Sequence, residues 1–298
     1  MEVIVTGASG LIGQALLARL EARGDRVRRM VRRPVIDQSE IRWDPDKGHL
    51  DPAALVGADA VVHLAGTGIA ERRWTRSQKD RILESRTRGT RLLAQSLSEV
   101  FPVGGPRVLV SGSAIGFYGD RGDEPLTESS EPGTGFLAEV CVAWESATQD
   151  AGLAGLRVTQ ARTGVVLSAA GGLLARLLPL FRIGLGGQVG SGDQIISWIS
   201  LADQVAALIW LIDTDVSGPV NLVAPSPVTN SEFSRTLGRV LGRPSRLRIP
   251  SAGPMLLYGR YLTRELILAS TLALPGVLVD SGFVFSHSSI ESALSANI

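Results

Sequence analysis

The stretch VIVTGASGLIG, residues 3–13, decides the fold. It joins an apolar strand to a TGxxGxxG turn, and an amphipathic helix begins directly after the turn. In such a turn Gly7 permits the tight reversal, Gly10 lets the backbone approach a pyrophosphate, and Gly13 lets the helix pack closely on the strand. The helix N-terminus then faces the phosphates. We therefore predict a dinucleotide site whose phosphate contacts come from Gly7, Ser9, Gly10, Leu11, Ile12 and Gly13.

Two arginines occupy the position that contacts the adenosine ribose in dinucleotide-binding folds. About 20 residues beyond the turn, where a carboxylate would hold the 2′-hydroxyl of NAD, the chain reads MVRRP, with Arg32 and Arg33. Arginine at this place suits a 2′-phosphate, so we predict NADP(H) in preference to NAD(H). The alternative is a solvated strand end in an arginine-rich protein.

Short apolar runs alternate with helical patterns through the first three quarters of the chain, which is typical of a parallel sheet with helices between its strands. The strands are expected at 3–6, 26–31, 60–64, 108–111, 156–162 and 220–222, and the helices at 11–23, 76–100, 137–151 and 201–212. The fold class is thus α/β: a Rossmann-type, doubly wound parallel sheet with helices on both faces. We assign 1–224 to this NADP-binding domain, with substrate-loop insertions around 171–200. Residues 225–298 form a small C-terminal capping lobe, with helices at 231–241 and around 255–274.

Bulk composition points to a small-molecule partner. The 298 residues carry a net charge of +1, with a pI near 8.0, so no global field steers the chain to nucleic acid or an anionic membrane. Cys141 is the single cysteine, and three scattered histidines offer no metal-ligand spacing. The longest apolar run, 266–279, is shorter than a membrane span. We expect a cytoplasmic protein without a structural metal.

The third strand ends in VVHLAG, residues 61–66. Small side chains suit backbone that lies beside a cofactor, so Leu64, Ala65 and Gly66 are predicted cofactor contacts. His63 lies within the apolar part of the strand, where a hydrogen-bonded core histidine is the preferred interpretation over a catalytic one.

Several motifs together resemble the atypical branch of the extended short-chain dehydrogenase/reductases. They are TGASGLIG at 6–13, LAG at 64–66, RRWT at 72–75, ESRTRGT at 84–90, SGSAIGFYG at 111–119, SWISLAD at 197–203 and VAPSPVTNSEF at 223–233. Within that branch the chain is most similar to "epimerase family" proteins, whose C-terminal lobe is a domain of unknown function. The resemblance implies a Rossmann-type fold and NADP binding, with Ser111 among the cofactor contacts.

The catalytic residues of active relatives are only partly present. Those enzymes use a serine, a tyrosine with a lysine four residues later, and a supporting asparagine; the ammonium lowers the phenol pKa so that it can exchange a proton with the substrate oxygen. Ser113 stands at the serine position. Leu137 and Cys141, or Phe136 and Val140 in the neighbouring register, replace the tyrosine and lysine.

Arg86 stands at the asparagine position. It cannot shuttle protons at neutral pH, but it can hold a phosphate or a substrate anion, and we place it among the cofactor contacts. A solvated helix arginine is the equally weighted alternative.

Two residues could replace the missing acid. Tyr118 is the only tyrosine in the Rossmann part, although a residue lining the substrate pocket is the simpler interpretation. Glu139 could act as a buried carboxyl with a raised pKa, or it could belong to the polar face of its helix. Cys141 falls on the apolar stripe of that helix, which favours a small core residue over a nucleophile.

Two functions remain open from the sequence. The first is an NADP-dependent oxidoreductase or epimerase-like enzyme that acts on a small carbonyl or sugar-nucleotide-like compound. The second is an NADP(H)-binding redox sensor or interaction protein without hydride transfer. Retention of Ser113 favours the enzyme slightly, and loss of the tyrosine and lysine favours the sensor.

Overall fold

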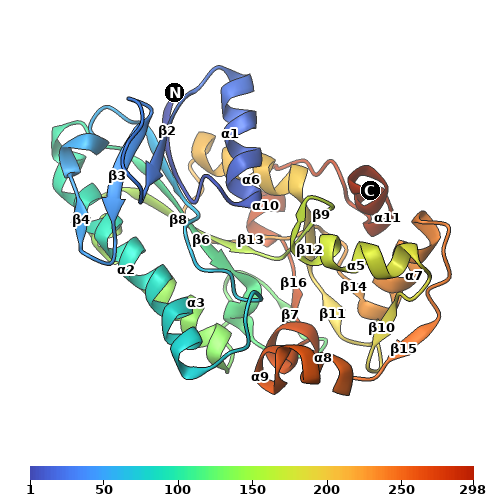
Figure 1. Ribbon diagram of the computed structural model, residues 1–298. Helices are drawn as coiled ribbons and strands as arrows, with labels where there is room; N and C mark the ends of the chain where they lie inside the picture. The colour runs from blue at the N-terminus through green and yellow to red at the C-terminus, as the bar shows by residue number, and fades with distance from the viewer.

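An eight-stranded sheet occupies the centre of the computed structural model, which describes residues 1–298 (Figure 1). Its strand order is β13-β8-β6-β5-β1-β2-β3-β4, and all neighbours are parallel except β3 and β4. The strands are β1 (Glu2–Thr6), β2 (Arg26–Val31), β3 (Glu40–Asp44), β4 (His49–Leu50), β5 (Ala60–His63), β6 (Val108–Ala114), β8 (Arg157–Thr163) and β13 (Gly218–Leu222). The order reverses between β1 and β5, so a crevice is expected at their carboxyl ends.

Helices cover both faces of this sheet (Figure 1). Val3 and Val5 of β1 pack with α1 (Leu11–Arg23) and α6 (Leu201–Asp213) on one face. Ile4, which points the other way, packs with α2 (Arg76–Val100) and α4 (Gln149–Leu153), and α3 (Phe136–Ser146) lies beside α2. The alternation along β1 follows from the two-residue period of a strand. The doubly wound α/β prediction is confirmed.

Some predicted elements differ from the structure. The expected helix at 137–151 is divided into α3 and α4, and β3 was not predicted. The expected helix around 255–274 is wrong: α8 (Ala252–Tyr258) ends at Gly259, whose φ of +86° lies in the region that favours glycine. After α9 (Arg260–Leu262) and a π-helical turn (Thr263–Ile267), residues Leu272–Ala273 form β16 instead, because they pair with β7 (Pro125–Leu126).

The C-terminal lobe is assembled from two separate segments of the chain. Its core unites α5 (Gly172–Arg182), β9 (Val165–Ser168) and β12 (Trp198–Ser200) with α7 (Asn230–Val240) and α11 (Ile290–Asn297). The packing therefore crosses the boundary expected at 224/225.

The tail that precedes α11 returns to the main domain. Leu278 of α10 (Gly276–Asp280) and Phe283 belong to the same core as α1 and α6. Fully buried Asp203, at the start of α6, accepts the backbone N–H groups of Ser286 and His287 at 2.8 and 3.0 Å. The tail thus ties the lobe to the sheet.

A chain of hydrogen bonds through His63 fixes the crevice between β1 and β5. The Thr6 hydroxyl oxygen accepts the N–H groups of Leu64 and Ala65, each at 3.1 Å, so its own hydrogen is directed to His63 Nδ1 at 2.7 Å. His63 Nε2 then donates to the Thr90 hydroxyl at 2.9 Å. Both threonines and the imidazole are fully buried, which confirms that His63 is a core residue.

We predict a pH-dependent stability from this histidine. Burial lowers the pKa of His63 from 6.5 to about 4. Between pH 4 and pH 6.5 the unfolded chain therefore binds a proton at this residue, and the folded chain does not. The stabilisation by neutral His63 is present above pH 6.5 and is lost as pH falls toward 4, by about 3 kcal/mol in total.

Urea unfolding between pH 7 and pH 4 measures this loss. His63→Gln should remove this pH-dependent loss of stability, whereas His49→Gln, at an exposed position, should retain it. An unchanged pH slope in His63→Gln would contradict the assignment.

Candidate functional site

The glycine turn after β1 has the geometry of a phosphate cradle. Gly7 has φ of +67°, and a Cβ there would lie 2.7 Å from the Leu64 carbonyl carbon; a Cβ on Gly13 would lie 2.3 Å from the Gly7 carbonyl oxygen. Gly10 is different, because its Cβ would meet only the Gly7 oxygen, at 3.3 Å. Two glycines thus serve close packing, and the third leaves an open surface.

The N-terminus of α1 faces that open surface. Gly10 is its N-cap, makes no side-chain capping bond, and no acidic residue occupies the first turn. Ser9 and Gly10 are exposed, and Leu11 and Ile12 are partly exposed. N–H groups at a helix start attract anions, so the structure brings the predicted phosphate contacts together around a site that lacks an internal anion.

The two arginines after β2 are not equivalent. Arg33 forms a two-pronged ion pair with the buried Glu40 carboxylate, with Nη1 2.8 Å from Oε2. The exposed Arg32 side chain has no ion-pair partner, and only its backbone carbonyl is engaged, by Arg42. Arg32 is therefore free to meet a phosphate, and Arg33 is committed to the protein.

The strand ends next to the cradle carry the remaining predicted cofactor contacts. Leu64 and Ala65 are partly exposed and Gly66 is exposed; all three follow β5, and Leu64 and Ala65 lie directly beside Gly7. Ser111 is fully buried within β6, next to His63 of β5. Ser111 is therefore a core residue in this structure, and its side chain is not exposed for direct contact with a cofactor.

Ser113 is joined to an ion pair that the sequence analysis did not identify. Its hydroxyl donates to Glu145 Oε1 at 2.6 Å, and the same carboxylate receives two hydrogen bonds from Arg162, Nε to Oε1 at 2.8 Å and Nη2 to Oε2 at 2.9 Å. Arg162 is 4% exposed. Burial alone would lower the Arg162 pKa, but its bonds to Glu145 raise it above the ordinary value. The hydroxyl proton of Ser113 is thus committed to Glu145.

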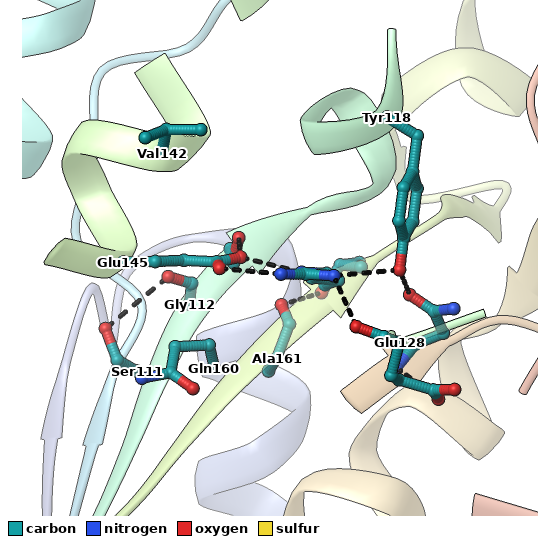
Figure 2. A network of polar contacts seen from close by, with 12 residues as sticks. Ser111, Gly112, Tyr118, Glu128, Val142, Glu145, Gln160 and Ala161 are labelled. Atoms are coloured by element: carbon teal, nitrogen blue, oxygen red, sulfur yellow. Dashed lines mark hydrogen bonds and ion pairs between the residues drawn. The ribbon is translucent and has the colours of Figure 1, made fainter. Parts of the chain in front are cut away.

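Tyr118 belongs to the same network and is enclosed by protein. Figure 2 shows Glu145 and Tyr118 on opposite sides of a guanidinium group, which their hydrogen bonds identify as that of Arg162. The phenol oxygen accepts from Arg162 at 3.0 Å and donates to Asn221 Oδ1 at 2.7 Å, and the residue is fully buried. Burial raises the Tyr118 pKa, although the bond from Arg162 opposes this. The structure supports neither the catalytic nor the pocket-lining interpretation.

Helix α3 carries the positions of the missing tyrosine and lysine. Leu137 and Cys141 point inward, with Cys141 Sγ 3.8 Å from the place of a Cβ on Gly116. Burial raises the Cys141 pKa to about 12, so this residue is a neutral core thiol. Glu139 lies on the opposite, exposed face. The proposal of a buried Glu139 acid is therefore wrong, because its place in the helical period turns it to solvent.

Arg86 of α2 lies beside the same end of the sheet. Its Nη1 donates to the carbonyl oxygens of Thr67 and Ile82 at 3.0 and 3.2 Å, and its guanidinium carbon would be 3.3 Å from a Cβ on Gly66. The predicted residues Gly66, Arg86 and Ser113 thus gather at the carboxyl edge, whereas Glu139 faces solvent and Tyr118 is enclosed by Arg162 and Asn221.

A small polar cavity adjoins the tyrosine position. It has a volume of about 150 Å³, and its lining includes Gly116 and Leu137 together with Arg264 and Glu265 of the lobe. Glu265 Oε2 accepts the Leu137 N–H at 2.9 Å, so the lobe supplies the anion at the start of α3. No cluster of three or more histidine, cysteine or carboxylate side chains could hold a metal ion. No helix combines the length and apolarity needed to cross a bilayer.

The partnership of Glu145 with Arg162 and the capping role of Glu265 were not predicted from the sequence. One signal was available: an arginine at the end of an otherwise buried strand requires a carboxylate nearby. The choice of Glu145 as that partner was not readable from the sequence.

Comparison with known proteins shows which protein family the chain matches. The model of the "NAD dependent epimerase/dehydratase family" matches residues 3–223, and a domain of unknown function, DUF1731, matches residues 249–296. The epimerase family protein Mb2239 of Mycobacterium bovis is 45% identical over 293 residues, 98% of this chain and 96% of its own length.

Two solved structures are similar over the whole chain. Human epimerase family protein SDR39U1, solved with NADPH, has a TM-score of 0.91 at 32% identity and covers 100% of this chain and 99% of its own. A nucleoside-diphosphate sugar epimerase from Corynebacterium glutamicum has a TM-score of 0.82 at 37% identity, and the match covers 100% of this chain and 58% of that one.

We predict that the Glu145 carboxylate is a major stabilising group. Glu145→Gln removes the charge that compensates buried Arg162 and should lower the free energy of unfolding by about 3 kcal/mol. Ser113→Ala removes one hydrogen bond and should cost only about 1 kcal/mol. Glu139→Gln, on the exposed face of the same helix, is the matched control and should stay within about 0.5 kcal/mol of the wild type. Urea unfolding tests the order, and equal stability of the two glutamate variants would contradict it.

Proposed function

Because the chain belongs to the NAD dependent epimerase/dehydratase family, we propose that it is an NADP(H)-dependent oxidoreductase or epimerase-like enzyme that acts on a small carbonyl or sugar-nucleotide-like compound. The observation that carries this proposal is the uncapped start of α1 at Gly10, together with the exposed, unpaired guanidinium of Arg32 after β2. An anion site at the glycine turn and an arginine after the second strand suit a dinucleotide with a 2′-phosphate. The NADPH complex of the human relative supports it.

The residues present fit such a cofactor. The N–H groups of Ser9, Leu11 and Ile12 would hold the pyrophosphate, Arg32 would hold the 2′-phosphate, and the backbone from Leu64 to Gly66 would border the cofactor. When bound, the nicotinamide supplies or accepts a hydride.

The chain's own groups at the reacting end are few. Ser113 uses its proton toward Glu145 at 2.6 Å, so its free lone pairs can accept a hydrogen bond from a substrate hydroxyl. No phenol or lysine stands at the α3 positions, which Leu137 and Cys141 occupy. Chemistry here therefore suits substrates whose oxygen is already polarised or easily protonated.

The second candidate is an NADP(H)-binding sensor or interaction protein without hydride transfer. The observation that favours it is the core character of Cys141 and Leu137, which fill the place of the acid and its cation with buried apolar groups.

Titration with NADPH and NADH, followed by a panel of aldehydes, ketones and sugar nucleotides, tests the proposal. We expect NADPH to bind, and at least one panel member to change the absorbance of the reduced nicotinamide. Binding of NADPH without turnover across the panel would favour the sensor. Absence of binding would contradict both.

We predict that Arg32, and not Arg33, reads the 2′-phosphate. Arg32→Ala should weaken NADPH binding about tenfold or more and leave NADH binding unchanged, because only NADPH loses a charge-assisted pair. Arg33→Lys keeps a cation beside Glu40 and should change neither affinity by more than about threefold. Fluorescence titration of both cofactors measures this. A selective loss of NADPH affinity in Arg33→Lys alone would reverse the assignment.

A further inference from the structure

Arg86 is a cation without a counter-charge. Arg162 is buried beside the Glu145 carboxylate, whereas the hydrogen bonds of Arg86 go only to the neutral backbone oxygens of Thr67 and Ile82. The face of its guanidinium lies 5.0 Å from the centre of the Trp144 ring. Burial lowers the Arg86 pKa, and the neighbouring thiol of Cys141 is neutral because its own pKa is raised to about 12. A partly buried charge without a counter-charge is costly, and a bound anion would offset that cost.

The free hydrogen-bond donors of Arg86 reach solvent. Its two internal bonds both use Nη1, so Nε and Nη2 make none. Neither atom is among the fully buried side-chain atoms that lack a partner. A guanidinium presents its donors as a planar fork that fits a carboxylate or phosphate. The open side of this fork is therefore built to receive a planar anion.

Arg86 also lies at the end of the sheet where the reacting groups are expected. Gly66, which follows β5 at the crevice, lies against its guanidinium, and the neutral thiol of Cys141, at the position of the lysine in active relatives, lies near it. A positive charge is thus present at the reacting end, but it comes from α2 and not from α3.

Trp144 links Arg86 to Ser113. The indole supports the guanidinium on one side and lies 3.0 Å from the place of a Cβ on Gly112, the neighbour of Ser113. At Ser113 the polarity is opposite to that of Arg86, because the hydroxyl proton is committed to Glu145 and only acceptor capacity remains. Arg86 can thus donate hydrogen bonds to an anion, and Ser113 can accept one from a hydroxyl.

We propose, resting on the proposed function, that the substrate is a hydroxy acid, whose carboxylate binds the free fork of Arg86 while its hydroxyl donates to Ser113 Oγ. A neutral alcohol would leave Arg86 without a counter-charge, and an acid without a hydroxyl would leave the Ser113 lone pairs without a donor. The pairing accounts for both features with a single ligand.

Calorimetric titration of the NADP⁺-saturated protein with three matched probes tests the pairing. Lactate carries both groups, lactamide lacks the charge, and propanoate lacks the hydroxyl. We expect D- or L-lactate to bind at least tenfold more tightly than either other probe. Arg86→Met should abolish the preference for lactate over lactamide, and Ser113→Ala should abolish the preference for lactate over propanoate.

Three controls keep the test decisive. Arg88→Met carries the same substitution on an exposed turn of α2, where Arg88 pairs with Glu84 at 2.9 Å, and should behave as the wild type. Arg86→Lys retains the charge and should keep part of the preference for lactate over lactamide. NADPH affinity is measured in parallel and should stay within about threefold of the wild type in Arg88→Met.

The contrary outcomes are distinct. Equal affinity for lactate and lactamide in the wild-type protein would overturn the hydroxy acid proposal while leaving the NADP(H) function standing. A tenfold loss of NADPH affinity in Arg86→Met would make Arg86 a cofactor contact and would also overturn it. Absence of NADP⁺ and NADPH binding by the wild type would overturn both proposals.

Discussion

The hydrogen bonds of the Thr6 hydroxyl hold the crevice of this protein in place. A single buried oxygen accepts two N–H groups from the segment after β5 and directs its own proton to His63, which in turn contacts Thr90 of α2. Thr90 also accepts the indole N–H of Trp144 at 3.0 Å. The ends of β1 and β5 are thereby joined to α2 and α3. Gly7 must be a glycine because this linkage draws the Leu64 backbone into the space of a side chain.

The same linkage positions the two arginines at the reacting end. Trp144, held by Thr90, supports Arg86 on its face, and the next residue, Glu145, binds Arg162 and Ser113. Arg162 has its counter-charge within the protein and serves stability. Arg86 has none and serves recognition in our proposal. The two guanidinium groups thus differ in role because only Arg162 has a carboxylate within reach.

The lobe completes this end of the molecule. Glu265, on a π-helical turn, caps the start of α3 and lines the cavity next to Leu137. Such turns often occur at functional sites because they alter the direction of side chains within a helix. The tail binds Asp203 at the start of α6, so it attaches the lobe to the Rossmann domain.

The sequence alone determined the doubly wound sheet and the phosphate cradle, because both depend on local patterns: apolar runs, helical periods, and three glycines at fixed spacing. It also indicated that His63 is a core residue, since every neighbour on its strand is apolar. The tertiary structure decided which polar groups meet. Tyr118 and Glu139 were plausible acids by position, yet one is enclosed by Arg162 and Asn221, and the other faces solvent. The partnership of Glu145 with Arg162, and the lack of a partner for Arg86, depend on distances between residues far apart in the chain. Local pattern does not encode those distances, because they arise from how the strands and helices pack.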